Sequence, residues 1–173
     1  ERRLMRVEAE DPLTLARTTW LGAVPLFEGL ATDGAFIREL AMKLTVLAKE
    51  PGEILIEKDT TGAEMYFIVQ GEVEVLTVLD EPPFVVLPAG SFFGEAALLE
   101  NGTRNAYVRA RETVQLYVLS KENLGLVLEQ YPDVEAIISR PLHERCQARK
   151  NAEVLQDLSR PCVQNCWSAM LVS

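Results

Sequence analysis

The amino-acid sequence predicts an α+β fold in which an antiparallel, jelly-roll-like β-roll is flanked by N-terminal helices and C-terminal helices. Two observations carry this prediction. Strand-like runs bounded by turn residues recur at roughly 8–12-residue spacing through the middle of the chain, as they do in barrels and jelly rolls. On either side, apolar residues recur at helical spacing. The predicted divisions are a helical segment over 1–47, a β-roll over 48–119, helices over 120–160 and a tail over 161–173.

The N-terminal segment is predicted to hold two capped helices. Asp11 precedes Pro12, which is the order expected of an N-cap followed by the first helical position. Asp33 is placed to cap a second helix. The apolar residues that follow it fall on one stripe: Phe36, Ile37, Leu40, Ala41 and Leu44.

The middle of the chain is predicted to form short strands. The strand-like runs are 54–56, 65–69, 73–75, 84–87, 106–108 and 114–119. Val73 and Val75 alternate with Glu72 and Glu74, the pattern of a strand with one buried and one polar face. We therefore expect the acidic side chains near this strand to lie on a solvated face.

The C-terminal part returns to helical spacing. Ser120 is placed to cap one helix, and Pro132 to begin another. Pro141 lies inside the second helical pattern, so we expect it to kink or end that helix. The apolar stripe predicted for this helix consists of Val134, Ile137 and Ile138.

Composition excludes several classes of protein. The 173 residues suffice for one domain with a core, and 48% hydrophobic with 25% charged residues is typical of a globular chain. A formal net charge of −9 argues against nucleic acid as a partner. The single His143 cannot build a His-rich metal site, so neither a metal site nor a cupin-like enzyme is predicted. Three cysteines, without a CxxC pair, favour a reducing, cytoplasmic location.

The segment 92–106 interrupts the strand series with a connection longer than a hairpin turn needs. Gly94 allows close approach of the backbone, and residues 95–99 read as one short helical turn whose free N–H groups favour an anion. Arg104 adds a fork of donors suited to a phosphate, and Glu95 adds an acceptor for a sugar hydroxyl. Together these groups predict a pocket for a ribose phosphate. The alternative for the two charged residues is an ordinary surface ion pair.

This segment resembles the phosphate-binding cassette of cyclic nucleotide-binding domains, whose pattern is F-G-E-x-A-L-[LI] followed by R-x-A. Here the matching stretches are Phe93-Gly94-Glu95-Ala96-Ala97-Leu98-Leu99 and Arg104-Asn105-Ala106. The resemblance extends from Val24 to about Arg149. Val24-Pro25-Leu26-Phe27 also resembles the start of the domain in cyclic-nucleotide-regulated ion channels. Membership of this family implies a ligand-binding β-roll between helices that regulates an attached domain.

The resemblance also implies roles for individual residues. Glu95 would accept from the ribose 2′-OH, and Arg104 would pair with the phosphate. Val75 and Val85 would pack on the base, and a helix beyond the roll would close over it and contribute Arg145. The ligand-binding residues implied by the cassette are Gly94, Glu95, Ala96, Ala97, Arg104, Asn105 and Ala106.

The function predicted is therefore that of a sensor, with no catalytic residue and no cofactor. Its ligand would be cAMP or cGMP. The family uses Thr after the phosphate arginine to favour cGMP, and this chain has Asn105 there, so we expect cAMP to be preferred.

Partners follow from the resemblance. The attached output domain would be a membrane channel or transporter, with the sensor at the cytosolic face, and a homo-oligomer is compatible with that setting. The alternatives are a kinase-regulatory cyclic nucleotide-binding protein and a relative that has lost nucleotide binding. A transcription regulator of the catabolite-activator family would need a helix-turn-helix, which the tail does not resemble.

Overall fold

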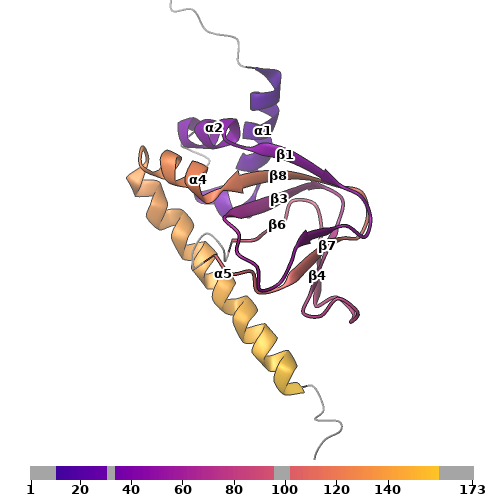
Figure 1. The fold of residues 1–173 in the computed structure, drawn as a ribbon. Helices are drawn as coiled ribbons and strands as arrows, with labels where there is room; N and C mark the ends of the chain where they lie inside the picture. Colours follow the sequence, from indigo (N-terminus) through magenta and orange to yellow (C-terminus); the bar gives the residue numbers. More distant parts are fainter. Residues whose placement is uncertain (1–10, 31–33, 96–101, 160–173) are drawn as a thin grey trace, which may run out of the picture.

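The structure, a computed structural model, describes residues 11–30, 34–95 and 102–159. Its helical elements are α1 (Pro12–Gly22), the 3₁₀ helix η1 (Pro25–Leu30), α2 (Gly34–Met42), α4 (Lys121–Leu128) and α5 (Pro132–Ser159). Its strands are β1 (Thr45–Lys49), β2 (Ile54–Ile56), β3 (Glu64–Gln70), β4 (Val73–Leu76), β5 (Val85–Leu87), β6 (Phe92–Phe93), β7 (Tyr107–Ala110) and β8 (Val114–Ser120). Figure 1 shows α1, α2 and α4 gathered at one end of the roll. The predicted α+β fold is confirmed.

The strands form two four-stranded sheets that together make the roll. The strand orders are β1-β8-β3-β6 and β2-β7-β4-β5, and every pairing within them is antiparallel. Several neighbours come from distant parts of the chain, since β8 lies between β1 and β3, and β7 lies between β2 and β4. This arrangement brings the residues after β2 and the residues before β7 to the same place.

The β3–β8–β6 part of the first sheet separates two hydrophobic cores. We call them the helix-side core, which contains residues of α1, η1, α2, α4 and α5, and the roll core, which lies between the sheets. Along β3, Met65 and Phe67 belong to the helix-side core, whereas Ile68 belongs to the roll core and Tyr66 packs against it. This is the alternation of side chains that an extended strand imposes.

The helical segment at the N-terminus ends earlier than predicted. The last helical residue of α2 is Met42, and β1 begins at Thr45, before the predicted limit at residue 47. The β-branched Thr45 and Val46 favour the strand, and they pair with Val118 and Tyr117 of β8. Asp11 occupies the predicted N-cap position but makes no side-chain cap hydrogen bond. The predicted cap at residue 33 lies outside the described residues.

The two C-terminal helices begin where the sequence predicts. The Ser120 hydroxyl accepts a hydrogen bond from the Asn123 N–H at 3.1 Å, which confirms the predicted cap of α4. Helix α5 begins at Pro132 and continues through Pro141 to Ser159, so of the two predicted outcomes, a kink or an end at Pro141, the end does not occur (Figure 1). Pro141 is exposed, so water can satisfy the carbonyl that its missing N–H leaves free.

The buried stripe of α5 differs from the predicted one. Val134, Ile138 and Leu142 lie in the helix-side core, whereas Ile137 is 46% exposed. The spacing i, i+4, i+8 keeps the first three residues on one face of the helix, and Ile137 lies beside it. Leu142 lies directly after Pro141, so the buried face of α5 continues past the proline.

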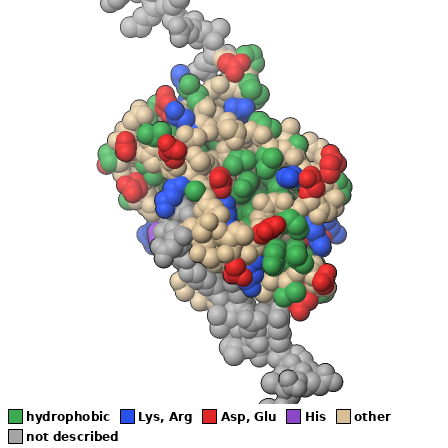
Figure 2. Space-filling model, in the orientation of Figure 1, with side chains coloured by type: hydrophobic (Ala, Val, Ile, Leu, Met, Phe, Trp, Pro, Cys, Tyr) green, Lys and Arg blue, Asp and Glu red, His purple; other side chains and the backbone are tan. Residues whose placement is uncertain are grey.

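Two of the acidic side chains predicted to be solvated near β4, Glu72 and Glu74, form ion pairs. Glu74 accepts from both Nε and Nη2 of Arg109, at 3.1 and 2.8 Å, and Glu72 accepts from Arg111 at 3.0 Å. On the face drawn in Figure 2, basic side chains are scattered among acidic ones.

Among the described residues, no helix is both long enough and apolar enough to cross a membrane.

Candidate functional site

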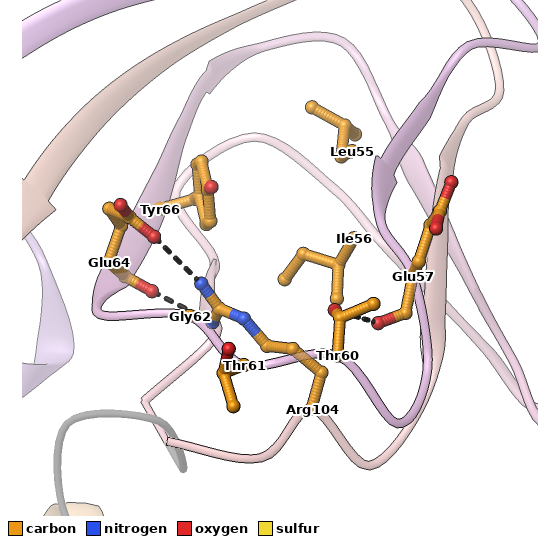
Figure 3. A pocket seen from close by; sticks show the side chains of 9 residues that line it. All are labelled: Leu55, Ile56, Glu57, Thr60, Thr61, Gly62, Glu64, Tyr66 and Arg104. Atoms are coloured by element: carbon orange, nitrogen blue, oxygen red, sulfur yellow. Dashed lines mark hydrogen bonds and ion pairs between the residues drawn. The ribbon is translucent and has the colours of Figure 1, made fainter.

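Arg104 lies at the centre of the candidate site and is almost completely buried, with 5% of its surface exposed. Its Nη1 donates to the backbone carbonyls of Glu64 and Gly94, at 2.8 and 3.1 Å. Its Nη2 donates to the Glu64 carboxylate at 3.2 Å (Figure 3). The two carbonyls fix the orientation of the guanidinium, because its donors form a rigid planar fork.

The backbone around Arg104 is held by the loop between β2 and β3. The Arg104 N–H donates to the Thr60 carbonyl at 2.8 Å, and the Asp59 N–H donates to the Arg104 carbonyl at 2.8 Å. The Gly62 N–H donates to the Gly102 carbonyl at 2.7 Å. These backbone hydrogen bonds place the loop and the arginine in a constant relative position.

Two glycines leave the space that the guanidinium occupies. A Cβ at Gly62 would overlap the Arg104 guanidinium, and a Cβ at Gly94 would lie 2.8 Å from Arg104 Nη1. Gly94 also has a φ of +84°, which side-chain-bearing residues rarely adopt. The predicted close approach at Gly94 is therefore present, and the approaching group is Arg104.

An aromatic pair lies beneath the arginine. Tyr66 stacks on Phe93 with ring centroids 5.1 Å apart and an interplanar angle of 13°. The Arg104 Cζ lies 5.8 Å from the centroid of the Tyr66 ring, within the range of a cation–π contact. Burial raises the pKa of the Tyr66 hydroxyl above its ordinary value, although the nearby Arg104 acts in the opposite direction. Tyr66 is therefore a neutral, rigid support for the guanidinium.

A hollow of about 220 Å³ opens beside Arg104 (Figure 3). It combines apolar walls with hydroxyl and carboxylate groups, which is the composition of a site for a small polar ligand. Its lining residues are Leu55, Ile56, Glu57, Thr60, Thr61, Gly62, Glu64, Tyr66 and Arg104.

The cassette residues predicted around this arginine are only partly described. Glu95 directly follows Gly94 after β6 and is buried, with 1% of its surface exposed. Asn105 is exposed, and Ala106 is partly buried against the roll core. Ala96 and Ala97 lie outside the described residues, and so does the predicted helical turn over 95–99 beyond its first residue. Glu95 and Arg104 therefore both lie in the interior, unlike a pair on the surface.

The predicted base and lid residues lie elsewhere in the fold. Val75 and Val85 are register partners in β4 and β5, belong to or pack on the roll core, and are not among the residues lining the hollow. Arg145 lies within α5, and its side chain is outside the described part. Their contacts with a base stay predictions.

The sequence did not indicate three residues that lie against the Arg104 guanidinium: Gly62, Glu64 and Tyr66. Glu64 and Tyr66 lie two positions apart in β3, so the strand puts them on the same face. The alternation along β3 could have indicated that face, but not that Arg104 lies against it.

Within the described residues, no group of three or more His, Cys, Asp or Glu side chains could hold a metal ion.

The fold is a β-roll flanked by helices, with a buried arginine beside a hollow, and solved structures share that fold. One, described as cAMP-bound PfPKA-R, matches with a TM-score of 0.72 and 21% identity over 88% of this chain and 50% of that one. The regulatory domain of Toxoplasma gondii PKA with cAMP matches with a TM-score of 0.62 and 19% identity, over 75% of this chain and 50% of that one.

Sequence relatives identify the family. Residues 47–131 match the sequence model of the cyclic nucleotide-binding domain. The chain is 34% identical over 157 residues to the potassium/sodium hyperpolarization-activated cyclic nucleotide-gated channel 2 of Mus musculus, covering 87% of this chain and 18% of the channel. It is 40% identical over 112 residues to the potassium/sodium hyperpolarization-activated cyclic nucleotide-gated channel 4 of Homo sapiens, covering 65% of this chain and 9% of that channel.

Residues 47–131 therefore belong to the cyclic nucleotide-binding domain family, and the domain resembles those of hyperpolarization-activated cyclic nucleotide-gated channels. This confirms the resemblance inferred from the cassette. The chain spans less than a fifth of the length of these channel relatives. These matches indicate a binding family and no catalytic one.

Proposed function

We propose that this chain binds a purine 3′,5′-cyclic monophosphate, with cAMP preferred, and transmits its occupancy to an attached channel or transporter at the cytosolic face. The observation that carries the proposal is the buried Arg104 beside a hollow, with backbone carbonyls behind it. A buried guanidinium held in one orientation is a ready partner for a singly charged phosphate.

The donors of Arg104 divide into two groups in this proposal. Nη1 is engaged by the carbonyls of Glu64 and Gly94, so a phosphate would approach through Nη2 and Nε. Glu95 would accept from the ribose 2′-OH, and Val75 with Val85 would contact the base. Because the carbonyl bonds hold the guanidinium before ligand arrives, little conformational entropy is lost on binding.

Calorimetric titration with cAMP and with cGMP tests the binding proposal. We expect one cAMP bound per chain and weaker binding of cGMP, because Asn105 offers no assured partner for the guanine amino group. A preference for cGMP of about tenfold or more, equal to ~1.4 kcal/mol, would reverse the assignment of the base. The absence of binding to either nucleotide would contradict the proposed function.

Regulation would work through α5 in this proposal. Its residues Val134, Ile138 and Leu142 pack in the helix-side core, so the first half of the helix is joined to the N-terminal helices. Nucleotide would add contacts for the second half, including Arg145, that exist only when the helix lies over the ligand. Binding would then shift the population towards that arrangement, since only differential contacts change an equilibrium.

Amide hydrogen exchange tests this movement. We expect exchange over residues 134–149 to slow when saturating cAMP is added, because new contacts protect the helix from opening. Strand β1, at the edge of its sheet and away from Arg104 in the strand order, serves as the internal control and should exchange at an unchanged rate. Equal exchange over 134–149 with and without cAMP would contradict the moving helix.

A relative that has lost nucleotide binding is the second candidate. The observation that favours it is the contact between the Glu64 carboxylate and Arg104, because a side chain of the protein already lies where a phosphate would bind. The two candidates differ in the titration: the second predicts no binding of cAMP at any accessible concentration.

A further inference from the structure

Glu64 contacts Arg104 through two different groups. Its backbone carbonyl accepts from Nη1 at 2.8 Å, and its carboxylate Oε2 accepts from Nη2 at 3.2 Å. The two side chains differ in burial, since 5% of the Arg104 side chain and 44% of the Glu64 side chain are exposed. The carbonyl contact depends on the backbone alone, whereas the carboxylate contact can be exchanged for water.

We propose that the Glu64 carboxylate is an internal anion that competes with the ligand's phosphate for Arg104. By its charge it selects a singly charged cyclic phosphodiester over a doubly charged phosphomonoester. This inference rests on the proposed function and adds a specificity-determining residue to the same site.

The position of the carboxylate supports competition rather than permanent closure. Glu64 and Arg104 both line the hollow, so a phosphate on Nη2 would meet the carboxylate directly (Figure 3). The Glu64 side chain is close to half exposed and can rotate into water, while the carbonyls of Glu64 and Gly94 keep the guanidinium in place. The Ala63 N–H donates to the same Oε2 at 3.1 Å, so it helps to hold the carboxylate beside Arg104 when no ligand is bound.

Selection follows from the ligand's charge. A cyclic phosphodiester carries one negative charge, whereas a phosphomonoester carries roughly −1.5 to −2 near pH 7. The repulsion between the carboxylate and the ligand is proportional to the ligand's charge, so it is about twice as large for the monoester. Arg104 attracts both ligands, and Glu64 reduces the advantage that the second charge would otherwise give to the monoester.

Titration of the wild type and of Glu64→Gln with cAMP and 5′-AMP tests the inference. The substitution keeps the backbone carbonyl and the size of the side chain but removes the charge. We expect the affinity for cAMP to rise on the order of fivefold and the affinity for 5′-AMP on the order of twenty-five-fold. The preference for cAMP over 5′-AMP should therefore fall about fivefold, since the two gains differ by that factor.

Glu72→Gln is the matched control. Glu72 is similarly exposed, pairs with Arg111 at 3.0 Å, and its substitution removes the same charge away from the hollow. We expect it to leave the ratio of the two affinities unchanged. Melting curves of both variants verify that they fold.

The outcomes separate this inference from the proposed function. If the wild type binds cAMP but Glu64→Gln improves neither ligand, or improves both equally, the competition is wrong and the binding function stands. Weaker binding in Glu64→Gln would also overturn it, because the carboxylate would then support the site. If none of the three proteins binds cAMP, the proposed function itself fails. Binding by Glu64→Gln alone would support the competition strongly.

Discussion

Replacement of Arg104 by alanine is expected to weaken cAMP binding by about 2–5 kcal/mol, which is roughly 30- to 5,000-fold in Kd. The large effect follows from burial: 5% of Arg104 is exposed, so the variant would leave the phosphate charge in a poorly solvated place without its cation. The carbonyls of Glu64 and Gly94 would also lose a donor. Calorimetric titration of the variant measures the effect directly.

Arg111→Ala is the control for that experiment. Arg111 is 54% exposed and pairs with Glu72 on the outer face of the roll, so its removal changes the net charge equally without touching the hollow. Unchanged cAMP affinity in Arg104→Ala would place the phosphate elsewhere. An equal loss in both variants would show that the general charge of the domain, rather than this contact, determines binding.

Gly62→Ala is expected to weaken cAMP binding by about ten- to a hundredfold, or ~1.4–2.7 kcal/mol. The new Cβ would overlap the Arg104 guanidinium. The guanidinium would have to move, and it would then lose its hydrogen bonds to the carbonyls of Glu64 and Gly94. The end of a long side chain can move more easily than a strand, so we expect the fold to be retained. Titration and melting curves together distinguish a displaced arginine from an unfolded domain.

Two further glycines provide a matched comparison for this result. Gly94 and Gly90 have nearly the same φ, +84° and +85°, so alanine causes similar backbone strain at both, of ~1–2 kcal/mol. Only at Gly94 would the Cβ meet Arg104, whereas at Gly90 nothing lies within 4 Å. Gly94→Ala should therefore impair binding more than Gly90→Ala does. Equal binding in these two variants, together with wild-type affinity in Gly62→Ala, would contradict the role of the arginine's position.

The sequence predicts the architecture better than the details of the site. The change of hydrophobic period from helix to strand and back is local information, and it suffices for the order of elements and for the cap at Ser120. The course of α5 was predicted less well. A proline within a helix is tolerated where its ring faces solvent, as at Pro141, and that exposure depends on packing that only the folded chain shows.

The candidate site shows the same limit. Glu95 and Arg104 can be found from the cassette, because both residues lie within one short segment. Apart from the Gly94 carbonyl, the partners of Arg104 come from β3 and the loop before it, about forty positions earlier, and they meet it only through the strand order of the roll. Glu64 alone looks like any acidic residue at the start of a strand. Its contact with the arginine depends on pairing that the local pattern does not contain.

Strand β3 contributes side chains to both hydrophobic cores, and this links the stability of one core to that of the other. Tyr66 faces Arg104 and the roll core, and the next residue, Phe67, packs against Trp20 and Phe27 on the other face. If one core lost its packing, one face of the first sheet would be exposed, while the other face of the same sheet would still be packed in the other core. Helices and roll are therefore tied into one cooperative unit. One peptide bond, between Tyr66 and Phe67, joins the side that faces Arg104 to the side that faces the helices.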